Sequence, residues 1–420
     1  MQRKNKQEEV TMEEVVITGM GCVSALGNNP DLLWENLLAG KSGVSMIDRF
    51  DTSAYVTKFA ASVNDFDPSE YFSSRDQSRF SKCIQYAVYS AYKALANAGI
   101  SPENEDPSRS GVIIGSGIGG MRIYNDSCVA LANRGPSRVS PFFIPMSITN
   151  MPAGEVSNRT GWMGPCFAVT SACATSNHSI ASAYDAIRLG RADIMLAGGA
   201  DETVNEVAVA GFCSMKALSK RNDDPTHASR PFDVGRDGFV IGEGAGMLVL
   251  ESRSHAEKRG AKILARLAGV GMSADAHHMS APREDGEGVR LAIEMALRDA
   301  GISASDVGYV NTHGTSTPLG DVAECSALEK VFGLRDTLKI NSSKCMIGHA
   351  LGAAGALEAI ITIKSLQNQM VHATTNIEQQ DERIHFDVCA NKNTSHSFRY
   401  AMSDGFGFGG HNSVVLLARD

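Results

Sequence analysis

Short apolar runs, many of them ending in glycine, recur along the whole chain. Apolar runs of this length, with few polar interruptions, are typical of strands buried on both faces of a sheet. We predict buried strands within the runs at 14–21, 110–120, 164–170, 192–199, 247–251, 307–311, 338–341 and 413–417.

Between these runs, apolar residues recur at helical spacing and glycine ends several segments. This pattern predicts helices over residues 31–39, 74–98, 174–189, 288–300, 321–332 and 350–366. Strands that alternate with helices predict an α/β fold. The helices at 174–189 and 350–366 are both rich in small residues and both follow a strand and a tight turn. They indicate a weak internal duplication, with Cys173 in the first turn and His349 in the second.

Cys173 has the strongest signal for chemistry. The segment from Ala168 to His178 predicts a strand end, a tight turn at Ser171–Ala172 and a helix start. Unpaired N–H groups and the positive helix end would favour a thiolate there, and the thiolate is the nucleophile. A lone cysteine is more often a buried apolar side chain. A lone cysteine becomes a stronger candidate for the nucleophile only when the chain also contains a histidine that could act with it.

Two of the eleven histidines lie in similar settings. His313 follows a predicted strand, and His349 opens a helix directly after Gly348. Such histidines are commonly structural, but strand ends in a duplicated α/β fold converge at one crevice. One cysteine with two histidines suggests acyl transfer, in which neutral imidazoles can hold an enolate oxygen. A cysteine protease would instead need one histidine as base and an orienting partner.

Composition argues against several other classes of protein. The chain has 420 residues and a formal net charge of −8, which argues against nucleic acid as the main partner. Its nine cysteines are scattered without a C-x-x-C pair, so we expect a reducing compartment, no disulfide framework and no metal site. Residues 1–14 are polar and predict a mobile tail without a secretory signal. No apolar run approaches the length of a membrane span.

The glycines at 115, 117 and 120 formally fit the G-x-G-x-x-G pattern of dinucleotide sites. Such a site needs an acidic residue about 20 positions further on. The region 138–145 contains no acid and two prolines. We therefore interpret these glycines as a tight loop.

Four motifs carry a resemblance to a known family. They are ACATSNHSI (172–180), NTHGTSTPLGD (311–321), NSSKCMIGHALGAAGALEAI (341–360) and GFGFGGHN (405–412). Together they resemble the beta-ketoacyl-[acyl-carrier-protein] synthases of the elongating, Cys-His-His type. The resemblance implies a five-layered α-β-α-β-α thiolase-like fold with two similar halves, which we place at 14–255 and 256–420.

The resemblance also implies roles at the reacting centre. Cys173 would be the acylated nucleophile. His313 and His349 would promote malonyl decarboxylation and bind the enolate oxygen. Lys344 and Glu358 would form a supporting polar pair, because a buried carboxylate is costly unless it is paired.

Further residues match those that bind or admit substrate. Thr315 and Thr317 would hydrogen-bond the phosphopantetheine arm. Phe408 would gate the site, and its N–H would form the oxyanion hole with that of Cys173. Phe406 would line the substrate path.

The family's carrier protein is acidic and brings the substrate on its phosphopantetheine, so no other cofactor is expected. Arg75, Arg79 and Lys82 would share one face of the helix at 74–98 and could dock this partner. A solvated helix face is the alternative, and Arg138 is a second docking candidate. A homodimer is expected, in the cytoplasm or in an organelle matrix such as a plastid.

The predicted reaction is the condensation of acyl-ACP with malonyl-ACP to 3-oxoacyl-ACP through an acyl-Cys173 intermediate. A polyketide ketosynthase and a non-catalytic chain-length-factor subunit remain alternatives, although such subunits usually lack the nucleophile. Asn177, His411 and the segment 152–155 depart from common family residues, which leaves acyl-chain length open.

Overall fold

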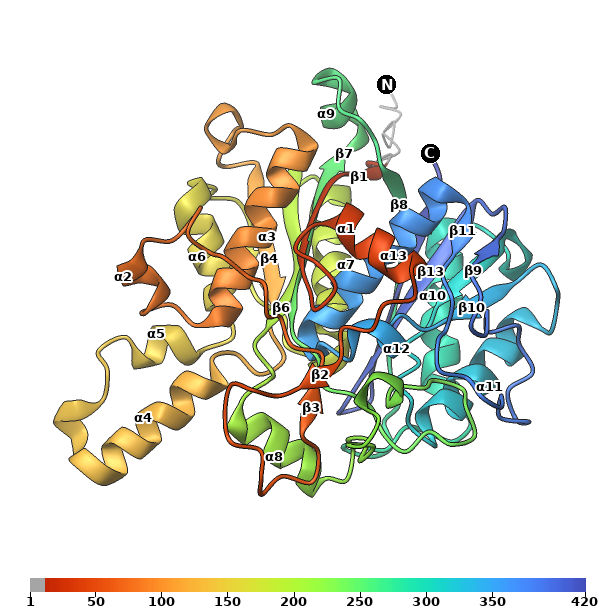
Figure 1. Ribbon diagram of the computed structural model, residues 1–420. Coiled ribbons are helices and arrows are strands. Elements are labelled where there is room, and N and C mark those ends of the chain that lie inside the picture. Colours follow the sequence, from red (N-terminus) through yellow and green to blue (C-terminus); the bar gives the residue numbers. More distant parts are fainter. Residues whose placement is uncertain (1–11) are drawn as a thin grey trace, which may run out of the picture.

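The computed structural model describes residues 12–420 and contains a ten-stranded sheet with the order β10-β9-β13-β14-β8-β1-β7-β6-β4-β5 (Figure 1). The strands of the first half are β1 Val15–Val23, β4 Ser110–Gly115, β5 Cys166–Phe167, β6 Ile194–Asp201 and β7 Gly244–Ser252. Those of the second half are β8 Ala265–Ala274, β9 Val307–Asn311, β10 Lys339–Asn341, β13 Tyr400–Gly407 and β14 His411–Ala418. Two small sheets pair β2 Ser45–Met46 with β3 Phe59–Ala60, and β11 Met370–Val371 with β12 Thr394–Ser395.

The strand order is the same in both halves when each is followed from the sheet centre outward. In the first half β1 and β7 are antiparallel, β7 and β6 are antiparallel, and β6 and β4 are parallel. In the second half β8, β14, β13 and β9 repeat these directions. The halves join through a short antiparallel contact between β1 and β8. The predicted duplication is therefore present in the sheet itself.

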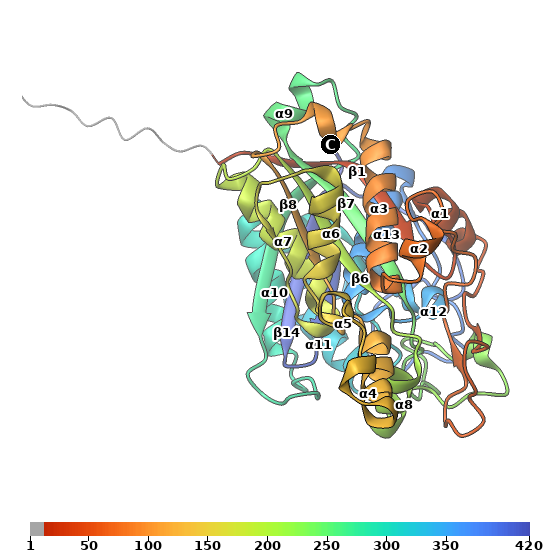
Figure 2. The ribbon, with the colours of Figure 1, turned by 90° about the vertical axis from the view of Figure 1, so that its left-hand side faces the viewer.

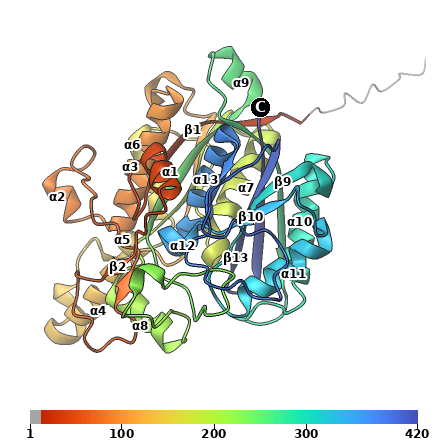
Figure 3. The same ribbon diagram turned by 45° about the vertical axis from the view of Figure 1, so that its right-hand side comes forward.

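The helices are α1 Pro30–Leu38, α2 Ser74–Gln77, α3 Lys82–Ala98, α4 Met121–Arg134, α5 Phe143–Ser147, α6 Met151–Thr160, α7 Thr175–Arg188, α8 Glu206–Ser214, α9 Arg253–Lys258, α10 Glu287–Ala300, α11 Gly320–Phe332, α12 Lys344–Ile347 and α13 Ala354–Asn368. Helices α7 and α13 pack against each other between the two half-sheets (Figures 1 and 3). Helices α3 and α6 cover the outer face of the first half, and α10 covers that of the second with α11 against it. The arrangement is the predicted thiolase-like α/β fold.

Small residues explain the close contact of the two central helices. Every residue of α13 from Ala354 to Ile363 is buried, so this part of the helix has no solvated face. A Cβ on Gly355 would lie 2.2 Å from Asn177 Oδ1 of α7, closer than any side chain could stand. Separate hydrophobic clusters fill the space between the half-sheets and the spaces beneath the outer helices. The fold thus has the layers that a duplicated α/β unit requires.

The predicted helix over 74–98 is wrong as one element. Ser73 and Ser81 each cap a separate helix, accepting hydrogen bonds from Asp76 N and Ile84 N. Serine side chains at such positions compete with continued helical bonding. As a result Arg75 lies in α2, Arg79 in the connection and Lys82 in α3. The three basic residues do not share one helix face.

Two strand predictions also need correction. The chain before Cys173 is not a buried strand, because β5 has only two residues, both exposed at the sheet edge, and residues 168–170 are irregular. The glycine-rich segment at 400–407, which carries no strand prediction, forms strand β13. Glycine is depleted in strands, but here Gly405 and Gly407 pack directly on the nucleophile turn.

The predicted N-terminal tail lies outside the described residues up to position 11. Glu14 is held in place, with its carboxylate bound to Arg253 and Arg266. Within residues 12–420 no helix has the length and apolar composition to cross a membrane. Helix α4 extends below the sheet and packs beside α5 and α8 (Figure 2).

Candidate active site

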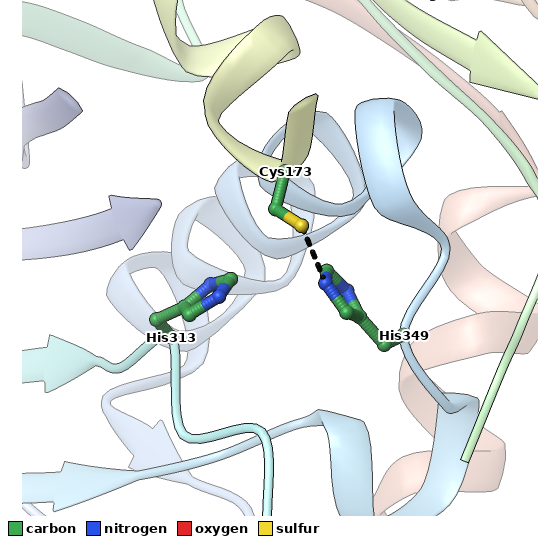
Figure 4. Close-up of side chains that lie close together, drawn as sticks. All are labelled: Cys173, His313 and His349. Carbon is green, nitrogen blue, oxygen red and sulfur yellow. Dashed lines mark hydrogen bonds between the residues drawn. The ribbon is translucent and has the colours of Figure 1, made fainter. Parts of the chain in front are cut away.

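Cys173 lies in a strained turn. Ala172 has a φ of +50°, a conformation that a residue with a Cβ rarely adopts, and one 3-10 turn over Ala172–Ala174 leads into α7. Ser171 N donates to Thr175 Oγ1 at 2.9 Å and closes the turn. This geometry places Cys173 at the helix start with its sulfur directed toward two imidazoles (Figure 4).

His349 approaches Cys173 from the second half. It follows α12 and Gly348, and its main chain pairs with the segment at 240–242: His349 N donates to Val240 O at 2.7 Å. Its Nε2 atom lies 2.9 Å from Cys173 Sγ, within hydrogen-bond distance. The ring packs edge-on against Phe239, with centroids 5.3 Å apart. The imidazole is thus held by main chain on one side and by an aromatic ring on the other.

His313 completes the group at the end of β9. Glu324 of α11 accepts hydrogen bonds from His313 N at 2.7 Å and Gly314 N at 2.8 Å. The His313 ring stands perpendicular to that of His349, with centroids 5.2 Å apart. One sulfur or nitrogen atom from each of the three residues lies within 4.8 Å of the others. The structure therefore brings together the three residues proposed from sequence.

Burial controls the charge of these groups. It raises the pKa of Cys173 to about 12, although the Lys344 ammonium acts in the opposite direction. The prediction that the helix start favours a thiolate did not include this burial, which acts in the opposite direction. Burial and Lys344 also hold the pKa values of His313 and His349 well below the usual range. Both imidazoles are neutral and can donate N–H bonds to an oxyanion.

The predicted polar pair of Lys344 and Glu358 is confirmed. The two side chains are fully buried and in contact, Lys344 from α12 and Glu358 from α13. Burial raises the pKa of Glu358 to about 7, and Lys344 acts against this shift. Asp404 of β13 is also buried, and its pKa is raised well above the usual range by burial and by Glu324 and Glu358. Sequence reasoning missed Glu324 and Asp404, since nothing local predicts their burial.

A cavity of about 530 Å³ opens onto this group. Thr315 and Thr317 line it, and their hydroxyl oxygens lie 3.1 Å apart. Asp321 of α11 fixes their loop by accepting from the N–H groups of Ser316 and Thr317. The cavity can therefore present two fixed hydroxyls to an elongated polar arm.

Phe406 and Phe408 line the same cavity from the glycine-rich end of β13. The Phe406 ring lies 5.6 Å from that of His313, and the Phe408 ring lies 6.5 Å from that of Phe212. Their positions agree with a substrate path that ends at Cys173. The gating and oxyanion roles of Phe408 remain predictions.

The predicted docking residues lie outside the cavity lining. Arg75 and Arg138 are exposed, while the Arg79 guanidinium stacks on Phe142 at 4.3 Å. Lys82 is half-buried, and burial together with Arg49 lowers its pKa. Lys82 is therefore a poor candidate for long-range attraction of an acidic partner.

The cysteine and two histidines are also the ligand types that zinc prefers. The buried ammonium of Lys344, however, adds a positive charge close enough to depress the pKa values of both histidines. A divalent cation at the same place would meet that repulsion. That no metal ion binds at this group stays a prediction.

Comparison with known proteins agrees with this geometry. The family model described as "Beta-ketoacyl synthase, N-terminal domain" matches residues 12–256, and "Beta-ketoacyl synthase, C-terminal domain" matches residues 264–378. The chain belongs to the beta-ketoacyl synthase family. Membership confirms the resemblance that the four sequence motifs indicated.

Relatives in this family match over nearly the full chain. A chloroplastic 3-oxoacyl-[acyl-carrier-protein] synthase I of Arabidopsis thaliana is 45% identical over 98% of this chain and 88% of its own length. A 3-oxoacyl-[acyl-carrier-protein] synthase 2 of Vibrio cholerae is 46% identical over 98% of this chain and 100% of its own length.

Solved structures of ketosynthases share the fold. A beta-ketoacyl synthase from Burkholderia phymatum superposes with a TM-score of 0.91 at 36% identity, covering 97% of this chain and 100% of that one. A type II polyketide ketosynthase, solved with its acyl-carrier protein and bound to a hexaketide, gives a TM-score of 0.90 at 32% identity with the same coverage.

Proposed function

We propose that the protein is the condensing enzyme of fatty-acid elongation, which joins acyl-ACP to malonyl-ACP to give 3-oxoacyl-ACP and CO2. The observation that carries this proposal is the contact of Cys173 with His349, beside His313, at the end of the cavity. Relatives named 3-oxoacyl-[acyl-carrier-protein] synthase over nearly the full chain support the substrate class.

The first step loads the acyl chain. Cys173 Sγ attacks the thioester carbonyl of acyl-ACP, the S–C bond to the carrier breaks, and the cysteine proton ends on the released pantetheine thiol. The N–H groups of Cys173 and Phe408 would hold the developing oxyanion. Because burial disfavours a free thiolate here, proton loss from Cys173 accompanies the attack. His349 Nε2, in contact with the sulfur, is placed to assist it.

The second step forms the carbon–carbon bond. Malonyl-ACP loses CO2, and the negative charge moves to the thioester oxygen as an enolate. His313 and His349 donate N–H bonds to that oxygen, which is the role that neutral imidazoles can fill. The enolate carbon attacks the acyl-Cys173 carbonyl, the Sγ–C bond breaks, and the thiolate regains a proton from solvent. We propose that no metal or organic cofactor takes part.

The test is condensation by purified protein supplied with acyl-ACP and malonyl-ACP, with mass spectrometry of the protein after loading. We expect an acyl adduct on Cys173 and loss of both adduct and product in Cys173→Ala. Cys213→Ala is the matched control, because Cys213 is half-buried next to Phe212 of the cavity. Normal turnover by Cys173→Ala would refute the proposal.

A polyketide ketosynthase is the second candidate, since a solved type II polyketide ketosynthase shares the fold. The higher identity to the fatty-acid enzymes favours elongation. The two differ in product, because an elongation enzyme performs one condensation per loaded chain when no reductase is present. Chains with several unreduced keto groups would point to the polyketide activity. The retained Cys173 argues against a non-catalytic chain-length-factor role.

An acyl carrier protein is the proposed partner, docked near Arg75, Arg79 and Arg138. Exposed arginines would attract an acidic carrier, and the effect would weaken with salt. Arg75→Glu with Arg138→Glu should raise KM for acyl-ACP while leaving KM for an acyl-pantetheine analogue unchanged. Equal effects on both substrates would remove these arginines from the docking site.

Nine free cysteines within the described residues support a reducing compartment, cytoplasm or organelle matrix.

A homodimer is also proposed. Strand β5 is an exposed sheet edge, and Phe167 on it and Met163 just before it are exposed apolar side chains. An open strand edge beside apolar side chains is a natural surface for a second copy. Light scattering should give twice the chain mass, and Phe167→Asp should give the monomer mass. A wild-type monomer would refute this assembly.

A further inference from the structure

The chain forms the nucleophile turn twice. In the first half Ala172, with a φ of +50°, precedes Cys173; in the second half Leu351, with a φ of +45°, precedes Gly352. Each turn continues through one 3-10 turn into one of the two central helices, α7 or α13. Gly352 therefore has the place in the second half that Cys173 has in the first. The sequence-based pairing of Cys173 with His349 is wrong by three residues.

Two equivalent strands each reach the turn of the opposite half. Strands β6 and β13 both have eight residues and the same place in their half-sheets. Strand β13 ends at Gly407, where a Cβ would lie 3.1 Å from Cys173 N. Strand β6 ends at Asp201, whose carboxylate lies beside Gly352 N. By position, Asp201 is the counterpart of Gly407.

The Asp201 carboxylate is bound as an oxyanion would be. Oδ2 accepts from Gly352 N at 2.7 Å and Gly117 N at 2.9 Å, and Oδ1 accepts from Ile118 N at 3.2 Å and from the Ser116 hydroxyl. The side chain is fully buried. A buried carboxylate is costly unless hydrogen bonds compensate it. These donors lower the pKa of Asp201, but burial outweighs them and raises it to about 6. At the turn of the first half, Gly407 of β13 has no side chain, which leaves the corresponding space beside Cys173 N for the substrate.

We propose that Asp201 fills the second half's equivalent of the oxyanion hole and is the positioning residue that fixes the turn from His349 to Gly352. The same carboxylate also reaches the nucleophile turn, because it binds Ser116 Oγ and Ser116 O accepts from Thr170 Oγ1 at 3.1 Å. Asp201 thus joins β6, the loop after β4 and the turn after His349. The Asp201 carboxylate therefore fixes the turn of the second half relative to the turn of the first half at the reacting centre.

Two consequences follow for the reaction. Loss of the carboxylate frees the turn that carries His349, so the decarboxylation step should suffer more than loading of Cys173. Loss also removes a negative charge that acts with burial to raise the pKa of Cys173. The other charged or titratable groups that face the sulfur are Lys344, Glu358, His313 and His349, and the substitution leaves them in place.

The test is Asp201→Asn, which keeps the size of the side chain and removes its charge. We expect malonyl decarboxylation to fall about 10- to 100-fold, with a smaller effect on Cys173 loading. The pH midpoint of Cys173 alkylation should move lower, because a negative charge that raises the pKa of Cys173 is lost. Asp299→Asn is the matched control, because Asp299 is a carboxylate on α10 that pairs with Arg188 outside the cavity lining. It should change neither quantity.

Decarboxylation within about twofold of wild type, or an unshifted alkylation profile, would overturn the inference, because a positioned charge must affect both. If Asp201→Asn does not fold, Asp201→Ser decides by the same two measurements. The inference rests on the proposed function. Assays of the wild-type protein distinguish a failure of that function from a failure of the role given to Asp201. Wild type that neither loads Cys173 nor condenses refutes the function, whereas an active wild type with an equally active variant refutes only the role of Asp201.

Discussion

The buried pair of Lys344 and Glu358 makes an asymmetric prediction for stability. Both side chains are fully buried, and the pKa of Glu358 is already raised to about 7. At pH 7 the neutral carboxyl beside the Lys344 ammonium is therefore about as stable as the ion pair. Glu358→Gln reproduces that neutral state, and its unfolded chain no longer gains by losing a proton. We predict that Glu358→Gln does not destabilise the protein at pH 7 and that it removes a pH dependence which Lys344→Met keeps.

The magnitude follows from the titration of Glu358. The folded protein keeps a proton on Glu358 that the unfolded chain loses, so its share of the stability falls as pH rises from about 4.5 to 7. A rise in pKa from 4.5 to about 7 corresponds to about 3 kcal/mol. Lys344→Met keeps the carboxyl and removes the ammonium that lowers its pKa, so the loss should extend to higher pH. The methionine fills much of the volume of the lysine stem.

The assay is unfolding by denaturant at pH 5 and at pH 7. The share of the unfolding free energy that depends on Glu358 should fall by about 2 kcal/mol between these pH values. Glu358→Gln should remove that fall, and Lys344→Met should keep it. A loss of several kcal/mol in Glu358→Gln at pH 7 would refute this account of the pair.

Three further predictions concern the site. His349→Ala should lower condensation about 10²–10³-fold, as loss of one oxyanion donor does, and a steady-state rate near wild type would contradict its role. Gly407→Ala should block loading of Cys173, because its Cβ would lie 3.1 Å from Cys173 N; intact-mass analysis should then find no acyl adduct, whereas full loading would exclude that crowding. Burial raises the pKa of Glu324 to about 8 from 4.5, so the folded protein keeps a proton that the unfolded chain loses. Stability should therefore fall as pH rises from about 4.5 to 8, and Glu324→Gln should flatten that slope in denaturant titrations; an unchanged slope would exclude Glu324 as its source.

Local pattern was sufficient for several elements and for the reacting residues. Strand β9 begins and ends where the apolar run at 307–311 does, and α10 and α11 lie within one residue of their predicted bounds. The spacing of apolar residues predicts which face of a helix or strand is buried. In these segments the apolar residues lie on the buried face, as predicted. Three of the four motifs identified Cys173, His313 and His349. Each of these motifs contains the reactive residue together with the residues that form its turn.

Long-range packing decided the remaining features. Pairing with β9 and β14 made the glycine-rich segment at 400–407 a strand. The split of the predicted helix at 74–98 is a local effect of the caps at Ser73 and Ser81, which the periodicity did not reveal. The charge state of Cys173 depends on how deeply the other half buries it, which no local window contains. Asp201 reads in sequence as the polar end of a strand, yet it binds Gly352 N from 151 residues away. Sequence determines which groups can react and which segments form elements, because those depend on neighbours along the chain. The protonation state of a side chain, its hydrogen-bond partners and the alignment of the two turns depend on neighbours in space. Only the folded structure brings those neighbours together.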